Sequence, residues 1–67
     1  MDPDAAWRDL NDETRSVGDR IEAGYALLDW IDEGGFLPKA LLPPNVATRY
    51  HALATVQRQI DYWETYR

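Results

Sequence analysis

The chain has 67 residues, of which twelve are acidic and seven are basic, and its formal net charge is −5. With no cysteine and a single histidine, it cannot form disulfides and has too few ligands for a zinc site. An acidic chain without a run of Lys or Arg lacks the basic face that binds nucleic acid, and no apolar stretch approaches the length of a membrane span. We predict one domain over residues 1–67, and the first residues, without a signal-peptide pattern, indicate the cytoplasm.

The small size of the chain limits its stability. A chain of this length buries only about 60% of the surface that its unfolded state exposes, so its core is a weak source of free energy. Small domains compensate with disulfides, with a metal or by association. Composition excludes the first two. Association with another chain is therefore the expected means of stabilisation.

Residues 3–33 are predicted to form one long helix. Asp2 is a suitable N-cap, Pro3 suits the first helical position, and the two glycines at 34 and 35 are a strong stop signal. Between these signals, large apolar residues recur every seven positions, which favours a helix over a strand. The two rows of this repeat are Trp7, Thr14, Ile21 and Leu28, and Leu10, Val17, Gly24 and Ile31, and six of these eight residues are large and apolar.

Two glycines bear on the continuity of this helix. Gly18 and Gly24 each cost about 1 kcal/mol relative to alanine in a helix interior. Residues 19–22 also have the sequence of a capping box, which predicts instead two helices, over 3–16 and 19–33. We favour a single helix, with a kink near Gly18 as an option, because the repeat passes through that residue without a slip. Gly24 lies on the apolar seam, where a missing side chain lets another helix approach closely.

A connector and a last helix follow. Within residues 34–44, Pro38 can begin one helical turn that Pro43 ends. Asn45 is a good N-cap for a helix over 46–66. The apolar connector residues that need cover are Phe36, Leu37, Leu41 and Leu42. The residues on one face of the last helix are Val46, Tyr50, Leu53, Val56, Gln57, Ile60 and Trp63.

The distribution of charge favours pairing of the two helices. Residues 1–33 carry ten acidic and three basic side chains, a net charge of −7, whereas residues 34–67 carry two acidic and four basic ones, a net charge of +2. Opposite charges favour packing of one arm on the other, so we predict an antiparallel helical hairpin. Its closed end brings Arg49 and the start of the last helix beside three acids at the end of the first, which are Asp29, Asp32 and Glu33.

The predicted hairpin has arms of unequal length. The last helix covers only about residues 11–33 of a straight first helix, at 1.5 Å per residue. Trp7 and Leu10 then have no partner within the chain. Either a second copy covers them, or the chain bends at Gly18 and folds its start back.

Aromatic residues off the apolar seams are candidates for a binding surface. Trp30 points nearly opposite the repeat of the first helix, and Tyr62 and Tyr66 lie on the far side of the last helix, with Trp63 at the edge. Trp and Tyr are enriched at the centres of protein interfaces. An alternative for Trp30 is that the apolar connector folds over it. The predicted protein-interaction residues are Trp7, Leu10, Trp30, Tyr62, Trp63 and Tyr66.

Nothing in the sequence predicts catalysis. Ser16 and His51 are the residues from which a hydrolytic site would be built, but the predicted helices do not bring them together. A chain this small also cannot wrap a substrate pocket of about 300 Å³. The acids at the end of the first helix do not follow a calcium-loop pattern. We therefore expect no enzyme activity, no cofactor, no metal site and no small-molecule substrate, and we take His51 as an ordinary surface residue.

These features predict a non-enzymatic protein-interaction module that self-associates into a homodimer or a higher helical bundle. The alternative is a small inhibitor or adaptor that binds a host protein through exposed aromatics. The preference for Arg over Lys and the many Asp residues are common in GC-rich bacteria and their phages, so a viral origin is one option for the alternative.

Overall fold

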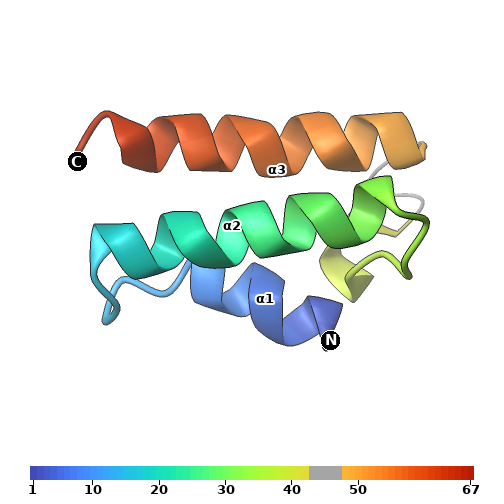
Figure 1. Cartoon of the computed structure of the whole chain (residues 1–67), viewed down its shortest axis with the longest axis horizontal. Coiled ribbons are helices and arrows are strands. Elements are labelled where there is room, and N and C mark those ends of the chain that lie inside the picture. Colours follow the sequence, from blue (N-terminus) through green and yellow to red (C-terminus); the bar gives the residue numbers. More distant parts are fainter. Residues whose placement is uncertain (43–47) are drawn as a thin grey trace.

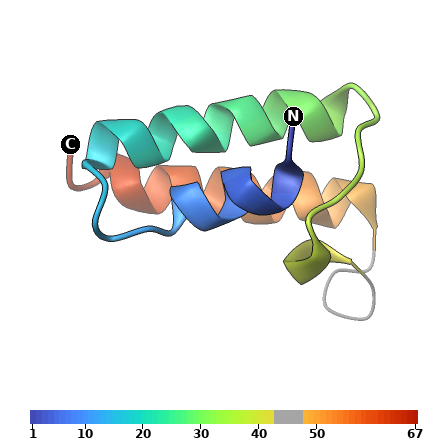
Figure 2. The ribbon, with the colours of Figure 1, turned by 90° about the horizontal axis from the view of Figure 1, so that it is seen from below.

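A computed structural model describes residues 1–42 and 48–67, and these form helices without any strand. The elements in chain order are α1 (Pro3–Leu10), α2 (Val17–Asp32), the short 3-10 turn η1 (Lys39–Leu41) and α3 (Arg49–Glu64). Helix α2 runs antiparallel to α3 on one side and to α1 on the other (Figure 1). Seen from below, α1 crosses in front of α3 while α2 lies alongside both (Figure 2). The all-α prediction is confirmed, and α2 and α3 form the expected antiparallel pair.

The prediction of one helix over 3–33 is wrong, because the chain leaves the helix after Leu10. Residues 11–16 turn it back and place α1 against α2. The side chain of Asn11 donates to the carbonyl of Trp7 at 2.8 Å, and the carboxylate of Asp12 accepts from the amide of Thr14 at 2.9 Å. Short polar side chains of this kind offer the backbone hydrogen bonds that compete with a helix.

The second helix begins at Val17, before the glycine at which we considered a break. Ser16 is its N-cap, in an extended conformation, and its hydroxyl accepts a hydrogen bond from the amide of Asp19 at 3.1 Å. The two-helix alternative over 3–16 and 19–33 therefore has the right number of helices and the wrong boundaries. Asp19 lies inside the helix, and the cap is three residues earlier.

The end of α2 agrees with the predicted stop. Gly34 has a positive φ of 95°, and its amide donates to the carbonyl of Ile31 at 3.1 Å. The amide of Gly35 donates to the carbonyl of Trp30 at 2.8 Å. This pair of bonds is a Schellman motif, which satisfies the last carbonyls of a helix and needs a residue that tolerates a positive φ.

The connector contains the predicted turn, and α3 begins later than expected. Pro38 precedes η1, and its carbonyl accepts from the amide of Leu41 at 2.9 Å. Pro43 and Asn45, the predicted end of this turn and the predicted N-cap, lie outside the described residues. Thr48 is extended and caps α3 through its hydroxyl, which accepts from the amide of His51 at 3.1 Å. The helix therefore starts at Arg49 and not at 46, because Thr48 itself supplies the cap.

The core lies where the three helices meet, at Gly24. A Cβ built on this glycine would lie 2.6 Å from Cγ1 of Ile60 and 2.9 Å from Cδ1 of Leu10, closer than real Cβ atoms come. Glycine is thus required for α1 and α3 to pack on α2 here. The predicted close approach at Gly24 is confirmed, and both approaching helices belong to the same chain. The buried apolar residues are Ala6, Leu10, Ile21, Leu27, Ile31, Leu41, Ala52, Val56, Ile60 and Trp63.

The folding back of α1 covers the start of the chain. Leu10 is fully buried, and Trp7 is half-buried against the core. Of the two alternatives for these residues, the structure has the bend within the chain, located at 11–16 and not at Gly18. The arm of the hairpin that was expected to overhang does not exist, so its unpaired residues no longer argue for a second copy.

Candidate protein-interaction surface

A groove runs between α2 and α3, with a volume of about 360 Å³. Both helices contribute to it, and its apolar part comes mainly from Leu28 on α2 and Leu53 on α3. The groove is open to solvent and is formed by two packed helices side by side, so it differs from the enclosed substrate pocket that the chain is too short to wrap. The residues that line the groove are Leu28, Asp29, Asp32, Tyr50, Leu53, Ala54 and Gln57.

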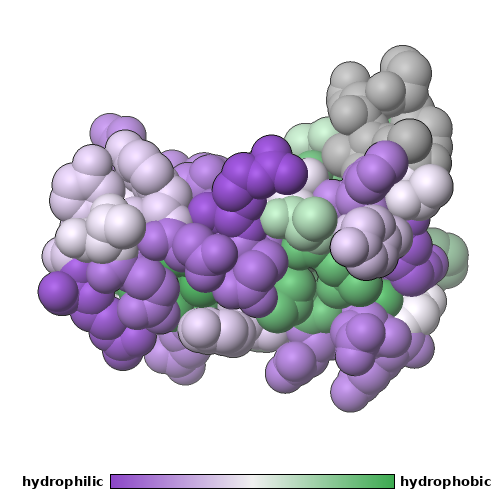
Figure 3. All heavy atoms as spheres, turned by 90° about the horizontal axis from the view of Figure 1, so that it is seen from above, coloured by the Kyte–Doolittle hydropathy of each residue, from purple (hydrophilic) through white to green (hydrophobic). Residues whose placement is uncertain are grey.

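The surface over α3 has a clear hydrophobic strip. Figure 3 looks down on this helix and shows hydrophobic atoms gathered beside it, with hydrophilic atoms around them. Tyr50 stands at the edge of the groove with 76% of its surface exposed, although the sequence placed it on the face that packs inward. Leu53 is half-buried and keeps part of its side chain at the surface.

The groove is acidic along its α2 side. Asp29 and Asp32 are exposed at its rim, and none of the described residues that line it is Lys or Arg. Gln57 at the other side donates to the carboxylate of Asp61 at 2.9 Å, which places a third acid one helical turn further along α3. These carboxylates give the apolar strip a border of negative charge.

Arg49 was expected to neutralise the acids at the end of α2. It does lie at that end, but its guanidinium donates to two backbone carbonyls, those of Ile31 at 3.0 Å and Gly35 at 2.7 Å. Within the described residues it forms no ion pair with Asp29 or Asp32. Arg49 therefore caps the backbone of α2 and leaves the negative charge of the groove in place.

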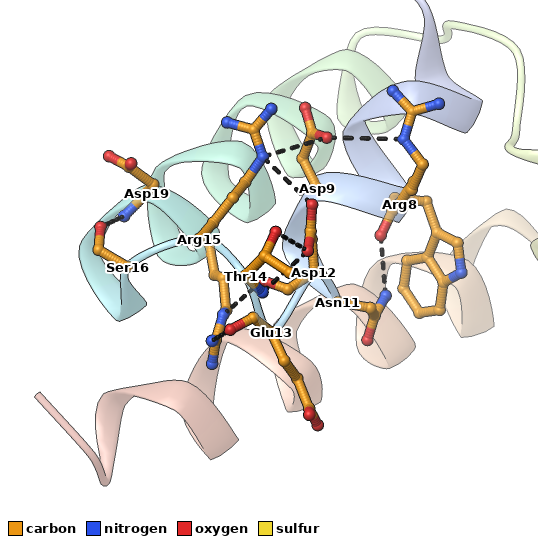
Figure 4. Close-up of polar contacts among 11 residues, drawn as sticks. Arg8, Asp9, Asn11, Asp12, Glu13, Thr14, Arg15, Ser16 and Asp19 are labelled. Atoms are coloured by element: carbon orange, nitrogen blue, oxygen red, sulfur yellow. Dashed lines mark hydrogen bonds and ion pairs between the residues drawn. The ribbon is translucent and has the colours of Figure 1, made fainter.

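At the other end of the molecule, polar contacts hold the turn between α1 and α2 (Figure 4). The guanidinium of Arg15 lies 3.4 Å from the carboxylate of Asp9 and 3.7 Å from that of Asp12. The hydroxyl of Thr14 donates to the same Asp12 carboxylate at 2.6 Å. The hydrogen bonds from the hydroxyl and the amide of Thr14 are the main reason why the pKa of Asp12 lies below its ordinary value of 3.8.

Arg20 of α2 and Trp63 of α3 bind the backbone of this turn and of the end of α1. Arg20 is buried, and it donates to the carbonyls of Asp12 at 2.8 Å and Glu13 at 2.7 Å. Its guanidinium carbon lies 4.4 Å from the centre of the Trp63 ring, a cation–π geometry. The indole of Trp63 donates to the carbonyl of Leu10 at 2.7 Å. Trp63 therefore joins the end of α3 to the turn, and it is 9% exposed.

The predicted interaction residues range from buried to exposed. Leu10 and Trp63 belong to the core, so the idea that they form an accessible surface is wrong. Trp30 is half-buried, and its indole donates to the carbonyl of Phe36 at 2.8 Å. The connector thus contacts Trp30 through its backbone and through Gly35, where an added Cβ would overlap the indole.

The connector covers less apolar surface than expected. Leu41 is buried and Leu37 is half-buried, but Phe36 is 82% exposed and Leu42 is 42% exposed. The ring of Phe36 therefore does not cover Trp30. Burial of the connector comes instead from the turn η1, whose start is held by the carboxylate of Asp4, which accepts from the amide of Lys39 at 2.7 Å.

Tyr62 and Tyr66 are the predicted residues that are well exposed, at 50% and 61%. Their hydroxyls lie 3.3 Å apart, and their ring centres are 5.3 Å apart in an edge-to-face arrangement. The hydrogen bond between them raises the pKa of Tyr62 above its ordinary value of 10.0. The ring of Tyr62 also meets that of Trp63 at 4.8 Å, so this pair is supported by the core.

The residues that would be needed for hydrolysis are not brought together. Ser16 caps the start of α2, whereas His51 is exposed in the first turn of α3. Because the two helices are antiparallel, these positions lie at opposite ends of the molecule (Figure 1). Among the described residues, no group of three or more His, Asp or Glu side chains is arranged to hold a metal ion.

Comparisons with protein-family models, with curated proteins and with solved structures find no match for this chain. No helix in the described part of the chain is both long and apolar enough to cross a membrane. The function must therefore be inferred from the chemistry of the surface.

Proposed function

We propose that the chain is a non-enzymatic protein-interaction module and that its binding site is the groove between α2 and α3. The proposal rests on a strip of apolar surface in the groove that is not buried in the three-helix core. Leu28 and Leu53 face this strip although the three-helix core packs without their full burial. Exposed apolar surface with a polar rim is typical of protein-binding sites.

The groove also has the rigidity that a binding site requires. It is formed by two helices whose packing is held by Gly24 and the buried residues around it. Its end is fixed by the hydrogen bonds of Arg49 to the last turn of α2 and the segment after it. A preformed groove loses little conformational entropy when a partner binds.

Self-association through the groove is the less favoured form of this function. An isologous pair places the same residues of two copies against one another, so Asp29 and Asp32 of both would share one interface. Like charges in such a position oppose association. An overhanging Trp7 and Leu10 no longer support self-association, because Leu10 is buried and Trp7 is half-buried within the chain. Binding to a different protein, as an inhibitor or adaptor, is therefore favoured.

The test compares Leu53→Asp with Leu42→Asp, which makes the same change at an exposed connector residue outside the groove. Each protein is immobilised, and proteins retained from a lysate of the source cells are identified. We expect wild type and Leu42→Asp to retain the same protein and Leu53→Asp to lose it. Circular dichroism of all three confirms that the variants are folded.

Tyr66→Ala tests the other exposed aromatic surface in the same experiment. If this variant loses the retained protein and Leu53→Asp keeps it, the binding site is the Tyr62–Tyr66 surface and the groove proposal is wrong. Light scattering at several concentrations measures the mass of the chain and so tests self-association. A mass that doubles with concentration in wild type, and not in Leu53→Asp, would make a second copy the occupant of the groove.

A further inference from the structure

The shape of the groove indicates what kind of segment fits it. The lining residues of α3 run from Tyr50 to Gln57, which is two helical turns, or about 10 Å at 1.5 Å per residue. A groove between two packed helices is filled most simply by a third helix, whose apolar residues at every third or fourth position enter it. Leu28, Leu53 and Ala54 are the apolar contacts that it offers to such a helix.

Two carboxylates line the α2 side of the groove. Asp29 and Asp32 lie on its α2 side, exposed and without an ion pair among the described residues. On α3, the groove-lining residue Gln57 donates to the carboxylate of Asp61 at 2.9 Å. A helix in the groove therefore meets the carboxylates of Asp29 and Asp32 along its α2 flank.

We infer that the groove binds an amphipathic helix of another protein that carries Lys or Arg on the flank facing α2. This inference rests on the proposed function and names the chemistry of the partner. Charge complementarity selects it over a second copy, because the chain has a net charge of −5 and none of the described residues that line the groove is Lys or Arg. Complementary charge also raises the association rate of a basic partner and lowers the affinity for acidic partners.

The probes are two synthetic peptides of about 18 residues, five helical turns, with the same stripe of Leu residues. One has Lys at the flanking positions and the other has Glu. Each carries a fluorophore, and its anisotropy is measured as the full-length chain is added. We expect the Lys peptide to bind about tenfold more tightly than the Glu peptide, because two exposed ion pairs contribute on this order. The difference should shrink in high salt.

Charge reversal identifies the residues responsible. The double variant Asp29→Lys, Asp32→Lys should prefer the Glu peptide. Its matched control is Glu13→Lys, Glu22→Lys, which changes the net charge equally at two exposed acids that do not line the groove. The control should keep the preference for the Lys peptide. If both double variants behave alike, the preference comes from net charge, and the inference is wrong.

The outcomes separate this inference from the proposed function. If both peptides bind equally and Leu53→Asp abolishes binding, the groove is a binding site but the partner is not selected by charge. If Leu53→Asp leaves peptide binding unchanged, the groove is not the site and both proposals fail. If the Lys peptide does not bind and the chain alone doubles its mass through the groove, the occupant is a second copy and the inference is overturned.

Discussion

The indole nitrogen of Trp63 donates a hydrogen bond of 2.7 Å to the carbonyl oxygen of Leu10, and this contact joins residues 53 positions apart. The same indole ring lies over the guanidinium of Arg20, which binds two further carbonyls of the turn that follows Leu10. One aromatic residue at the end of α3 therefore secures the fold-back of α1. This contact is the point at which the three helices depend on one another most directly.

Trp63→Phe should lower the free energy of unfolding by about 1–3 kcal/mol, because the buried carbonyl of Leu10 loses its donor. The matched variant is Trp30→Phe, which also removes an indole hydrogen bond, here to the carbonyl of Phe36 at an exposed position. Water can replace that bond, so its loss should be smaller. Urea unfolding measures both. Equal losses would show that the Leu10 contact has no special role.

Arg20→Lys should loosen the turn between α1 and α2. A lysine keeps the charge but cannot hold the carbonyls of Asp12 and Glu13 with one planar group, so we expect a loss of about 1–3 kcal/mol. Hydrogen exchange should increase in residues 11–16. Arg58→Lys is the control at an exposed position, and it should change neither quantity. Unchanged exchange in the turn of Arg20→Lys would contradict this role.

Gly24→Ala and Gly18→Ala should have opposite effects. At Gly24 the added methyl group meets Ile60 and Leu10 within 3 Å, and overpacking of this kind costs about 1–3 kcal/mol. At Gly18 the nearest atom is the Ser16 hydroxyl at 4.0 Å, so alanine fits and should stabilise the helix by roughly 0.4–1 kcal/mol. Thermal unfolding measures whether each variant is more or less stable than wild type. A Gly24→Ala variant as stable as wild type would contradict the close packing.

Thr14→Val should raise the pKa of Asp12 towards 3.8, because the hydroxyl that stabilises the carboxylate is removed. A pKa lowered in the folded state contributes stability above the unfolded value, and this contribution is lost as pH falls through the folded pKa. Thr14→Val should therefore be less stable than wild type above about pH 4, with a difference that shrinks in acid.

The carboxyl carbon shift of Asp12 in a pH titration measures this effect directly. Thr65→Val is the control, because its hydroxyl donates to the carbonyl of Tyr62 and not to a carboxylate. The control should leave the titration of Asp12 unchanged. An unchanged titration in Thr14→Val would show that the hydroxyl does not stabilise the charge.

Local signals in the sequence were reliable at two helix ends, although the capping box at residues 19–22 misplaced the start of α2. The end of α2 at Gly34 follows from the positive φ that glycine tolerates, and the start of α1 follows from the capping of Pro3–Leu10 by Asp2. The candidate surface was predicted less well. Leu53 and Tyr50 have the same spacing as core residues, so periodicity assigned them to the seam and the groove was missed.

The break at 11–16 shows where periodicity misleads. The sevenfold repeat continues from Leu10 to Val17, so the sequence predicted one helix. The turn between them has local support from Asp12 and Ser16, but its contacts with Arg20 form only after the chain has folded back. A sequence repeat indicates which residues need burial, but it does not indicate which helix buries them.

The helical class and the stop at Gly34 could be predicted from the sequence because they depend on local backbone geometry, and Gly24 could be predicted to permit a close approach because it has no side chain. The burial of Leu10 by its own chain and the place of Trp63 in the core became clear from the packing of the three helices. This packing also decided which strip of apolar surface stays open between α2 and α3. The physical reason is that burial depends on distant segments, whose relative placement is set by all the contacts together.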